Sequence, residues 1–126
     1  MKLRIKGSSL RLRVSPSEVA QLLKAGRIEE TINFGFDESA KLTYALELGR
    51  NSGAMTASYA SSGITIMVSP LDAQRWAASQ DVGLYGETET SQGVLHFAVE
   101  KDFACLDKSD QENADTFPHP RQGAVC

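Results

Sequence analysis

The sequence predicts an α+β fold made of two successive β-β-α-β-β units, with two helices and eight mostly antiparallel strands. Segment 10–23 resembles segment 64–77, because each alternates polar and apolar residues, continues through Val-Ser-Pro and ends in an amphipathic stretch. Connections that contain no helix are short, and short connections favour antiparallel hairpins. We therefore expect an internal duplication of 1–49 and 54–100 within a single domain, 1–126, whose eight strands form a sheet system or a barrel.

Both helices are predicted from the Val-Ser-Pro triplets at 14–16 and 68–70. In each triplet the serine suits the N-cap, because its side-chain oxygen can accept a hydrogen bond from the first helical turn. The proline suits the first helical position, where its missing N–H costs nothing. Glu18 adds a capping box to the first helix. We therefore expect helices over 16–25 and 70–78.

Alternation of apolar and polar residues with a period of two indicates half-buried strands on both sides of each helix. The first two strands are separated by Gly7-Ser8, which suits a type II′ hairpin turn. This turn aligns two pairs of like charges on one face, Arg4 with Arg11 and Lys2 with Arg13. Like charges directly opposite each other repel, so we expect a negative group nearby. The predicted strands cover 2–6, 10–14, 28–34, 41–48, 54–60, 64–68, 82–88 and 94–100.

The composition is that of an ordinary soluble globular domain, with 126 residues of which 41% are hydrophobic and 23% charged. No apolar run approaches the roughly 20 residues that cross a bilayer. The first residues alternate charged and apolar side chains, unlike a secretory signal. We therefore expect a cytoplasmic protein with no membrane partner. The net charge of −3 is unlike that of most nucleic-acid-binding proteins.

Charge is distributed unevenly along the chain. Residues 1–27 hold seven basic residues and one acidic residue, whereas an acidic C-terminal tail is expected over 101–126. The basic hairpin has three interpretations. The tail or Glu29-Glu30 lies over it, it binds a small anion or an acidic protein surface, or it binds nucleic acid, which the lack of interleaved aromatic residues disfavours. The candidate ligand-binding residues are Lys2, Arg4, Arg11 and Arg13.

The only two histidines and two cysteines lie near the C-terminus of the sequence. Thiolate and imidazole are the ligands that tetrahedral zinc prefers, which makes zinc the alternative cofactor, with His96, Cys105, His119 and Cys126 as candidate ligands. Their wide spacing is unlike the close pairs of structural zinc sites. In the other interpretation there is no cofactor, His96 faces outward from its strand and Cys105 is a buried apolar residue. A disulfide between Cys105 and Cys126 is a further alternative.

No motif in the sequence identifies a reaction. There is no Gly-rich phosphate loop after a strand, no His-Glu-x-x-His and no nucleophile elbow. Paired acids occur at 37–38 and at Glu87 and Glu89, but acids in loops and at strand ends are usually solvated. We therefore expect a binding or protein-interaction module rather than an enzyme. The sequence does not predict its oligomeric state.

Two stretches of the sequence carry a resemblance to other proteins. They are Met-Lys-Leu-Arg-Ile-Lys-Gly-x-x-Leu-Arg-Leu-Arg at 1–13 and Val-Glu-Lys-Asp-Phe-Ala-Cys-Leu at 99–106, the latter followed by Phe-Pro-x-Pro and a terminal cysteine. In these motifs the chain resembles a family of small uncharacterised bacterial proteins over nearly its whole length. The resemblance implies a bacterial, cytosolic, single-domain protein with no assigned activity. The family often has asparagine at the position of His119, which argues against His119 as a zinc ligand.

Overall fold

The computed structural model describes residues 1–49, 53–103 and 114–118, and these contain two helices and eight strands. The predicted α+β class is confirmed, and both helices lie where the sequence predicts them. In chain order the elements are β1 (Lys2–Lys6), β2 (Ser9–Val14), α1 (Pro16–Ala25), β3 (Arg27–Asn33), β4 (Lys41–Leu48), β5 (Thr56–Ala60), β6 (Gly63–Val68), α2 (Pro70–Ala78), β7 (Gly83–Thr90) and β8 (Gly93–Lys101).

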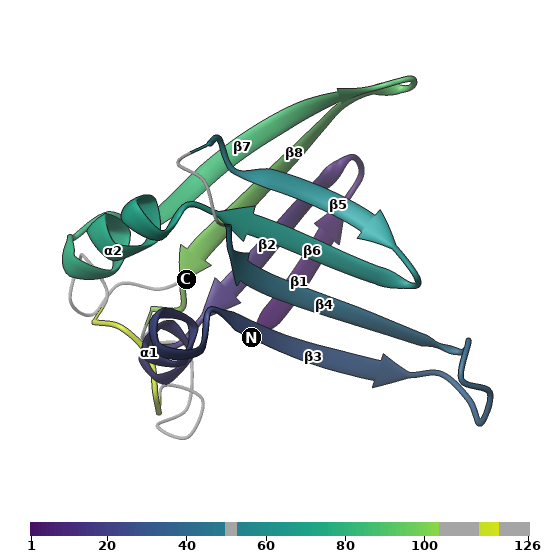
Figure 1. Cartoon of the computed structure of the whole chain (residues 1–126), viewed down its shortest axis with the longest axis horizontal. Helices are drawn as coiled ribbons and strands as arrows, with labels where there is room; N and C mark the ends of the chain where they lie inside the picture. Colours follow the sequence, from purple (N-terminus) through teal and green to yellow (C-terminus); the bar gives the residue numbers. More distant parts are fainter. Residues whose placement is uncertain (50–52, 104–113, 119–126) are drawn as a thin grey trace.

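The strands form two four-stranded sheets, in the orders β1-β2-β8-β7 and β3-β4-β6-β5 (Figure 1). Each sheet consists of two antiparallel hairpins joined in the middle by a parallel pair, β2 with β8 or β4 with β6. The predicted antiparallel hairpins are therefore confirmed, but the barrel alternative is wrong. Each half of the chain gives one hairpin to each sheet, and the two sheets end at separate edge strands instead of joining each other.

Both helices begin as the sequence predicts. Ser15 Oγ accepts a hydrogen bond from the backbone N–H of Glu18 at 3.3 Å, and Glu18 Oε1 accepts one from the N–H of Ser15 at 3.0 Å, which completes the capping box. In α2, Ser69 Oγ accepts from the N–H of Asp72 at 3.1 Å. Helix α1 stops at Gly26, whose φ of 82° suits glycine. Across the described residues, neither helix has the length and apolar character needed to span a membrane.

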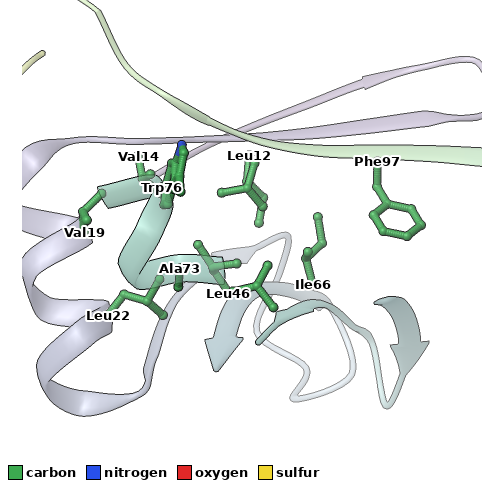
Figure 2. Packing of buried hydrophobic residues seen from close by; sticks show 11 residues of the cluster. Leu12, Val14, Val19, Leu22, Leu46, Ile66, Ala73, Trp76 and Phe97 are labelled. Atoms are coloured by element: carbon green, nitrogen blue, oxygen red, sulfur yellow. The ribbon is translucent and has the colours of Figure 1, made fainter. Parts of the chain in front are cut away.

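The core lies between the two sheets and is closed at one end by the helices (Figures 1 and 2). Leu12 and Phe97 point from the first sheet toward Leu46 and Ile66 of the second (Figure 2). Trp76 of α2 fills the space at the helical end, with 2% of its surface exposed. Residues from both halves of the chain therefore belong to one hydrophobic core.

Two hairpins extend beyond their neighbours as arms, at the end opposite to the helices (Figure 1). Strand β4 pairs with β6 only from Thr43 to Leu48, so the β3–β4 hairpin continues past the second sheet. Strand β8 pairs with β2 only from His96 onward, so the β7–β8 hairpin continues past the first. We call the former, with its connecting loop, the β3–β4 arm.

The described part of the tail lies against the body of the protein. The N–H of Phe117 donates to the carbonyl of Asp102 at 2.7 Å, and the Phe117 ring meets Phe103 edge to face with centroids 6.2 Å apart. Asp115 accepts hydrogen bonds from the hydroxyl and the N–H of Ser17 at the start of α1, and these bonds hold the pKa of its carboxyl below the ordinary value. This segment therefore connects the end of β8 to the start of α1.

Candidate functional site

The outer face of the β1-β2-β8-β7 sheet carries the basic residues singled out in the sequence. The observed register pairs Arg4 with Arg11 and Lys2 with Arg13, which confirms the predicted hairpin. The φ of Gly7 is 54°, as the first turn residue of a type II′ turn requires. Because side chains alternate along each strand, all four cations lie on the face that points away from the core.

Glu100 supplies the negative group that the opposed cations require. Strand β8 lies parallel to β2, which places Glu100 beside Arg13 and Ala98 beside Arg11. Glu100 Oε1 lies 3.0 Å from Arg11 Nε and 4.0 Å from Arg13 Nε, and the Glu100 side chain is only 12% exposed. Its Oε2 accepts a hydrogen bond of 2.8 Å from the hydroxyl of Tyr85 on β7. One carboxylate thus offsets the charge of one arginine from each opposed pair.

Lys2 has a separate carboxylate partner. Its Nζ lies 2.9 Å from Asp102 Oδ2, and the Asp102 side chain is 10% exposed. Asp102 belongs to the acidic tail, so the internal interpretation of the basic face is confirmed for Lys2. The other internal candidates lie on β3, in the second sheet. There Glu29 pairs with Arg27, and Glu30 lies 3.4 Å from the N-terminal ammonium group, so neither forms an ion pair with a side chain of the basic hairpin.

A groove of about 530 Å³ lies over this outer face. Arg4 and Lys6 line it, and no carboxylate of the described residues forms an ion pair with either of them. Ala98 forms part of the floor and is 7% exposed although it faces outward, because Arg11 and Tyr85 flank it in register. The two longer side chains therefore cover the alanine almost completely.

His96 and Glu87 also line the groove. His96 Nδ1 lies 3.4 Å from Glu87 Oε2, and both side chains are largely exposed, which confirms the outward orientation predicted for His96. The part of the chain that the structure describes contains no group of three potential metal ligands. The remaining zinc candidates, Cys105, His119 and Cys126, lie outside the described residues, as does the alternative disulfide. Zinc binding therefore stays a prediction.

Tyr85 links the acidic and basic parts of the site and gives it a pH dependence. Burial, followed by the hydrogen bond to Glu100, raises the pKa of the Tyr85 phenol above its ordinary value of 10.0. The unfolded chain therefore loses this proton at a lower pH than the folded chain. The contribution of Tyr85 to the free energy of unfolding is complete below pH 10.0 and is lost as the pH rises through the higher pKa of the folded state.

We predict that the difference in free energy of unfolding between the wild type and Tyr85→Phe is constant at neutral and mildly alkaline pH. Above the ordinary tyrosine pKa this difference should fall. Urea unfolding at a series of pH values measures it, and the comparison with Phe cancels the titration of all other groups. If this difference in free energy of unfolding stayed constant through the alkaline range, the pKa of Tyr85 would not be raised in the folded state.

One family model matches the chain over nearly its whole length. The model of DUF7009, a family of unknown function, matches residues 1–121. The chain belongs to this family. The resemblance to an uncharacterised family is thereby confirmed, and membership assigns no activity. No curated protein and no solved structure matches the chain.

The groove residues of this DUF7009 chain that were not among the candidates from the sequence include Lys6, Tyr85 and Ala98. The signal for Lys6 is present, since it continues the alternation of Lys2 and Arg4 along the first strand. Tyr85 and Ala98 carry no comparable signal, because their place beside the basic hairpin depends on the pairing of β8 with β2.

The second sheet offers an internal comparison for the basic face. Strands β4 and β6 pair in parallel over six residues, as β8 and β2 do in the first sheet. Thr65 and Met67 occupy the places of Arg11 and Arg13, and Ser58 that of Arg4. The same strand arrangement therefore exists in this molecule without the cations, so the architecture does not require them.

Proposed function

We propose that the groove on the outer face of the first sheet binds an anionic group, a carboxylate or a phosphate, carried by a small molecule or by an acidic protein segment. Three of the five cations on this face have carboxylate partners. The other two, Arg4 and Lys6, line the groove and have none among the described residues. This uneven balance is the observation that supports the proposal, because a bound anion would offset charge that the described protein groups leave unbalanced.

The groove is arranged for such a ligand before it binds. Glu100 contacts Arg11 through Nε, which leaves the other guanidinium N–H groups of Arg11 available. Arg4 lies directly opposite Arg11, so one anion can accept hydrogen bonds from both residues. A hydrogen bond to a charged group contributes about 1.5–3 kcal/mol, enough for two or three of them to hold a small anion.

Binding is better supported than nucleophilic catalysis. Ser9, His96 and Glu87 lie side by side on β2, β8 and β7, which is the residue composition of a catalytic triad. However, Ser9 Oγ donates to the backbone carbonyl of Lys6 at 2.6 Å, so its proton is directed away from the imidazole. The described geometry therefore gives the serine no general base.

Arg4→Ser tests the proposal, because it places at this position the residue found at the corresponding Ser58 of the second sheet. We predict that inorganic phosphate perturbs the NMR amide signals of the groove in the wild type. Arg4→Ser should weaken phosphate binding by about tenfold, the equivalent of about 1.4 kcal/mol. The matched control is Arg75→Ser on α2, an exposed arginine outside the groove, which should bind phosphate as the wild type does.

Three outcomes would contradict the proposal: no binding by the wild type, equal loss in both variants, or unchanged binding by Arg4→Ser. Thermal unfolding of both variants verifies that they fold. Because Arg4 is exposed on an edge strand, we expect its substitution to change stability little.

We also infer that the two β-β-α-β-β units arose by duplication. The matching Ser-Pro helix starts, the equal strand orders of the two sheets and the corresponding registers of β2 and β6 support this origin. On this view the cations were gained or kept on one copy alone. We further propose that the protein is bacterial, which rests on the resemblance, and cytoplasmic, which rests on the composition.

A further inference from the structure

The tip of the β3–β4 arm exposes two large aromatic side chains. Phe34 is 71% exposed, and Phe36 is exposed as fully as in an extended chain, at 112%. Scattered exposed apolar residues are ordinary, but two phenylalanines together at the end of a projecting hairpin are typical of a contact with another molecule. Aromatic residues are also the side chains that contribute most at the centres of interfaces.

The arm tip is ordered and acidic. The N–H of Phe34 donates to the carbonyl of Ala40 at 2.6 Å, and the N–H of Ala40 donates to the carbonyl of Asp37 at 2.9 Å. Asp37 and Glu38 follow Phe36 directly in this loop. The Glu38 side chain is 97% exposed, and its Oε2 lies 3.7 Å from Lys41 Nζ, a surface ion pair of the kind that contributes little. The arm therefore presents apolar rings and carboxylates together, in a loop that pays little entropy on binding.

The groove on the first sheet has the complementary chemistry. It combines the cations Arg4 and Lys6 with the exposed aromatic ring of Tyr85. The arm belongs to the second sheet, which lies on the inner side of the first sheet (Figure 1). The residues that line the groove lie on the outer side of the first sheet. A contact between the arm tip and this groove therefore has to join two copies of the chain.

We propose that the groove of one copy binds the β3–β4 arm tip of a second copy, with the Asp37 and Glu38 carboxylates at Arg4 and Lys6 and the Phe36 ring against the exposed ring of Tyr85. This inference rests on the proposed function, since it names the carrier of the anionic group. Opposite charges orient the two copies during encounter, and the Phe36 ring against Tyr85, which is 63% exposed, removes apolar surface from water.

Sedimentation equilibrium over a range of protein concentrations tests this inference. The wild type should self-associate, and Phe36→Ser and Arg4→Ser should each weaken the association by at least about tenfold, as expected for residues at the centre of an interface. Leu71→Ser is the matched control, because Leu71 is exposed on α2 at the other end of the molecule. It should associate as the wild type does.

Mixing the two weakened variants gives a sharper test. Phe36→Ser keeps an intact groove and Arg4→Ser keeps an intact arm, so an equimolar mixture should associate more strongly than either variant alone. Inorganic phosphate should dissociate the wild type by competing for the groove. Association as strong as that of the wild type in either variant, or a mixture that associates no more strongly than the variants alone, would overturn the inference.

The same measurements separate this inference from the proposed function. A wild type that is monomeric at every concentration, but whose phosphate binding is weakened by Arg4→Ser, overturns the arm contact and leaves anion binding in place. A monomeric wild type whose phosphate binding does not respond to Arg4→Ser overturns both.

Discussion

Trp76→Ala is expected to lower the free energy of unfolding by about 3–5 kcal/mol, the usual cost of truncating a buried tryptophan. The ring is 2% exposed, and its Nε1 donates to the carbonyl of Val82 at 3.3 Å. The ammonium group of Lys101 lies 5.8 Å from the ring centroid, and burial there lowers the pKa of Lys101. Truncation would open a cavity, remove one of the two hydrogen bonds that the Val82 carbonyl accepts (the other comes from the N–H of Lys101) and remove the aromatic face beside Lys101. Urea unfolding followed by circular dichroism measures the loss.

Trp76→Phe is the matched control for this prediction. It keeps an aromatic ring in the core but loses the indole N–H and part of the volume, so we expect a cost of about 1–2 kcal/mol. Trp76 is the only tryptophan of the chain, so neither variant has tryptophan fluorescence to follow. Circular dichroism can follow unfolding in the wild type and in both variants. If Trp76→Ala cost no more than Trp76→Phe, the ring would not fill the helical end of the core as described.

Gly86→Ala is expected to lower the free energy of unfolding by about 1–3 kcal/mol through overpacking. Gly86 on β7 is paired with Phe97 on β8, and the Phe97 ring lies over the glycine. A Cβ at Gly86 would lie 2.5 Å from Cε2 and 2.9 Å from Cζ of that ring. Phe97 is only 3% exposed and packed in the core, so its ring cannot move away without disturbing its neighbours.

A double-mutant cycle with Phe97→Leu identifies the cause. The smaller leucine makes room for the added methyl group, so Gly86→Ala should cost at least about 1 kcal/mol less in the Phe97→Leu background. Gly53→Ala is the control for replacing a glycine as such, because a Cβ there meets no atom within 4 Å. Equal costs of Gly86→Ala in both backgrounds would assign the destabilisation to the backbone of β7 and not to the ring.

The local parts of the fold could be predicted from the sequence because nearby residues determine them. Gly7-Ser8 sets the register of the first hairpin, and Ser15 and Ser69 set the helix starts. The parallel pairing of β2 with β8 could not be predicted in the same way. Both strands alternate apolar and polar residues, and no residue near either one specifies which hairpin lies beside it. That choice depends on how the helices cross between the sheets and on packing over the whole core.

The candidate site, like the fold, could be predicted only where it depends on residues close in sequence. Alternation along the hairpin was enough to place Arg4 and Arg11 together on an outward face. It could not reveal that Glu100 forms an ion pair with Arg11 while no described carboxylate forms one with Arg4, because Glu100 reaches this face only through the β2–β8 pairing. The distinction between balanced and unbalanced cations, on which the proposed function rests, is therefore a property of tertiary structure.

The β2–β8 pairing also has a consequence for how the protein is made. A ribosome releases β2 early, but β8 is the last of the described strands to emerge. Strands β3, β4, β5 and β6 are contiguous in the chain, so the second sheet can assemble while synthesis continues. The first sheet must wait for a partner from the far end, a pairing of high contact order that is slow to form. The inner side of β2, with Leu12 and Val14, is thus the part of the nascent chain most in need of protection until translation has passed β8.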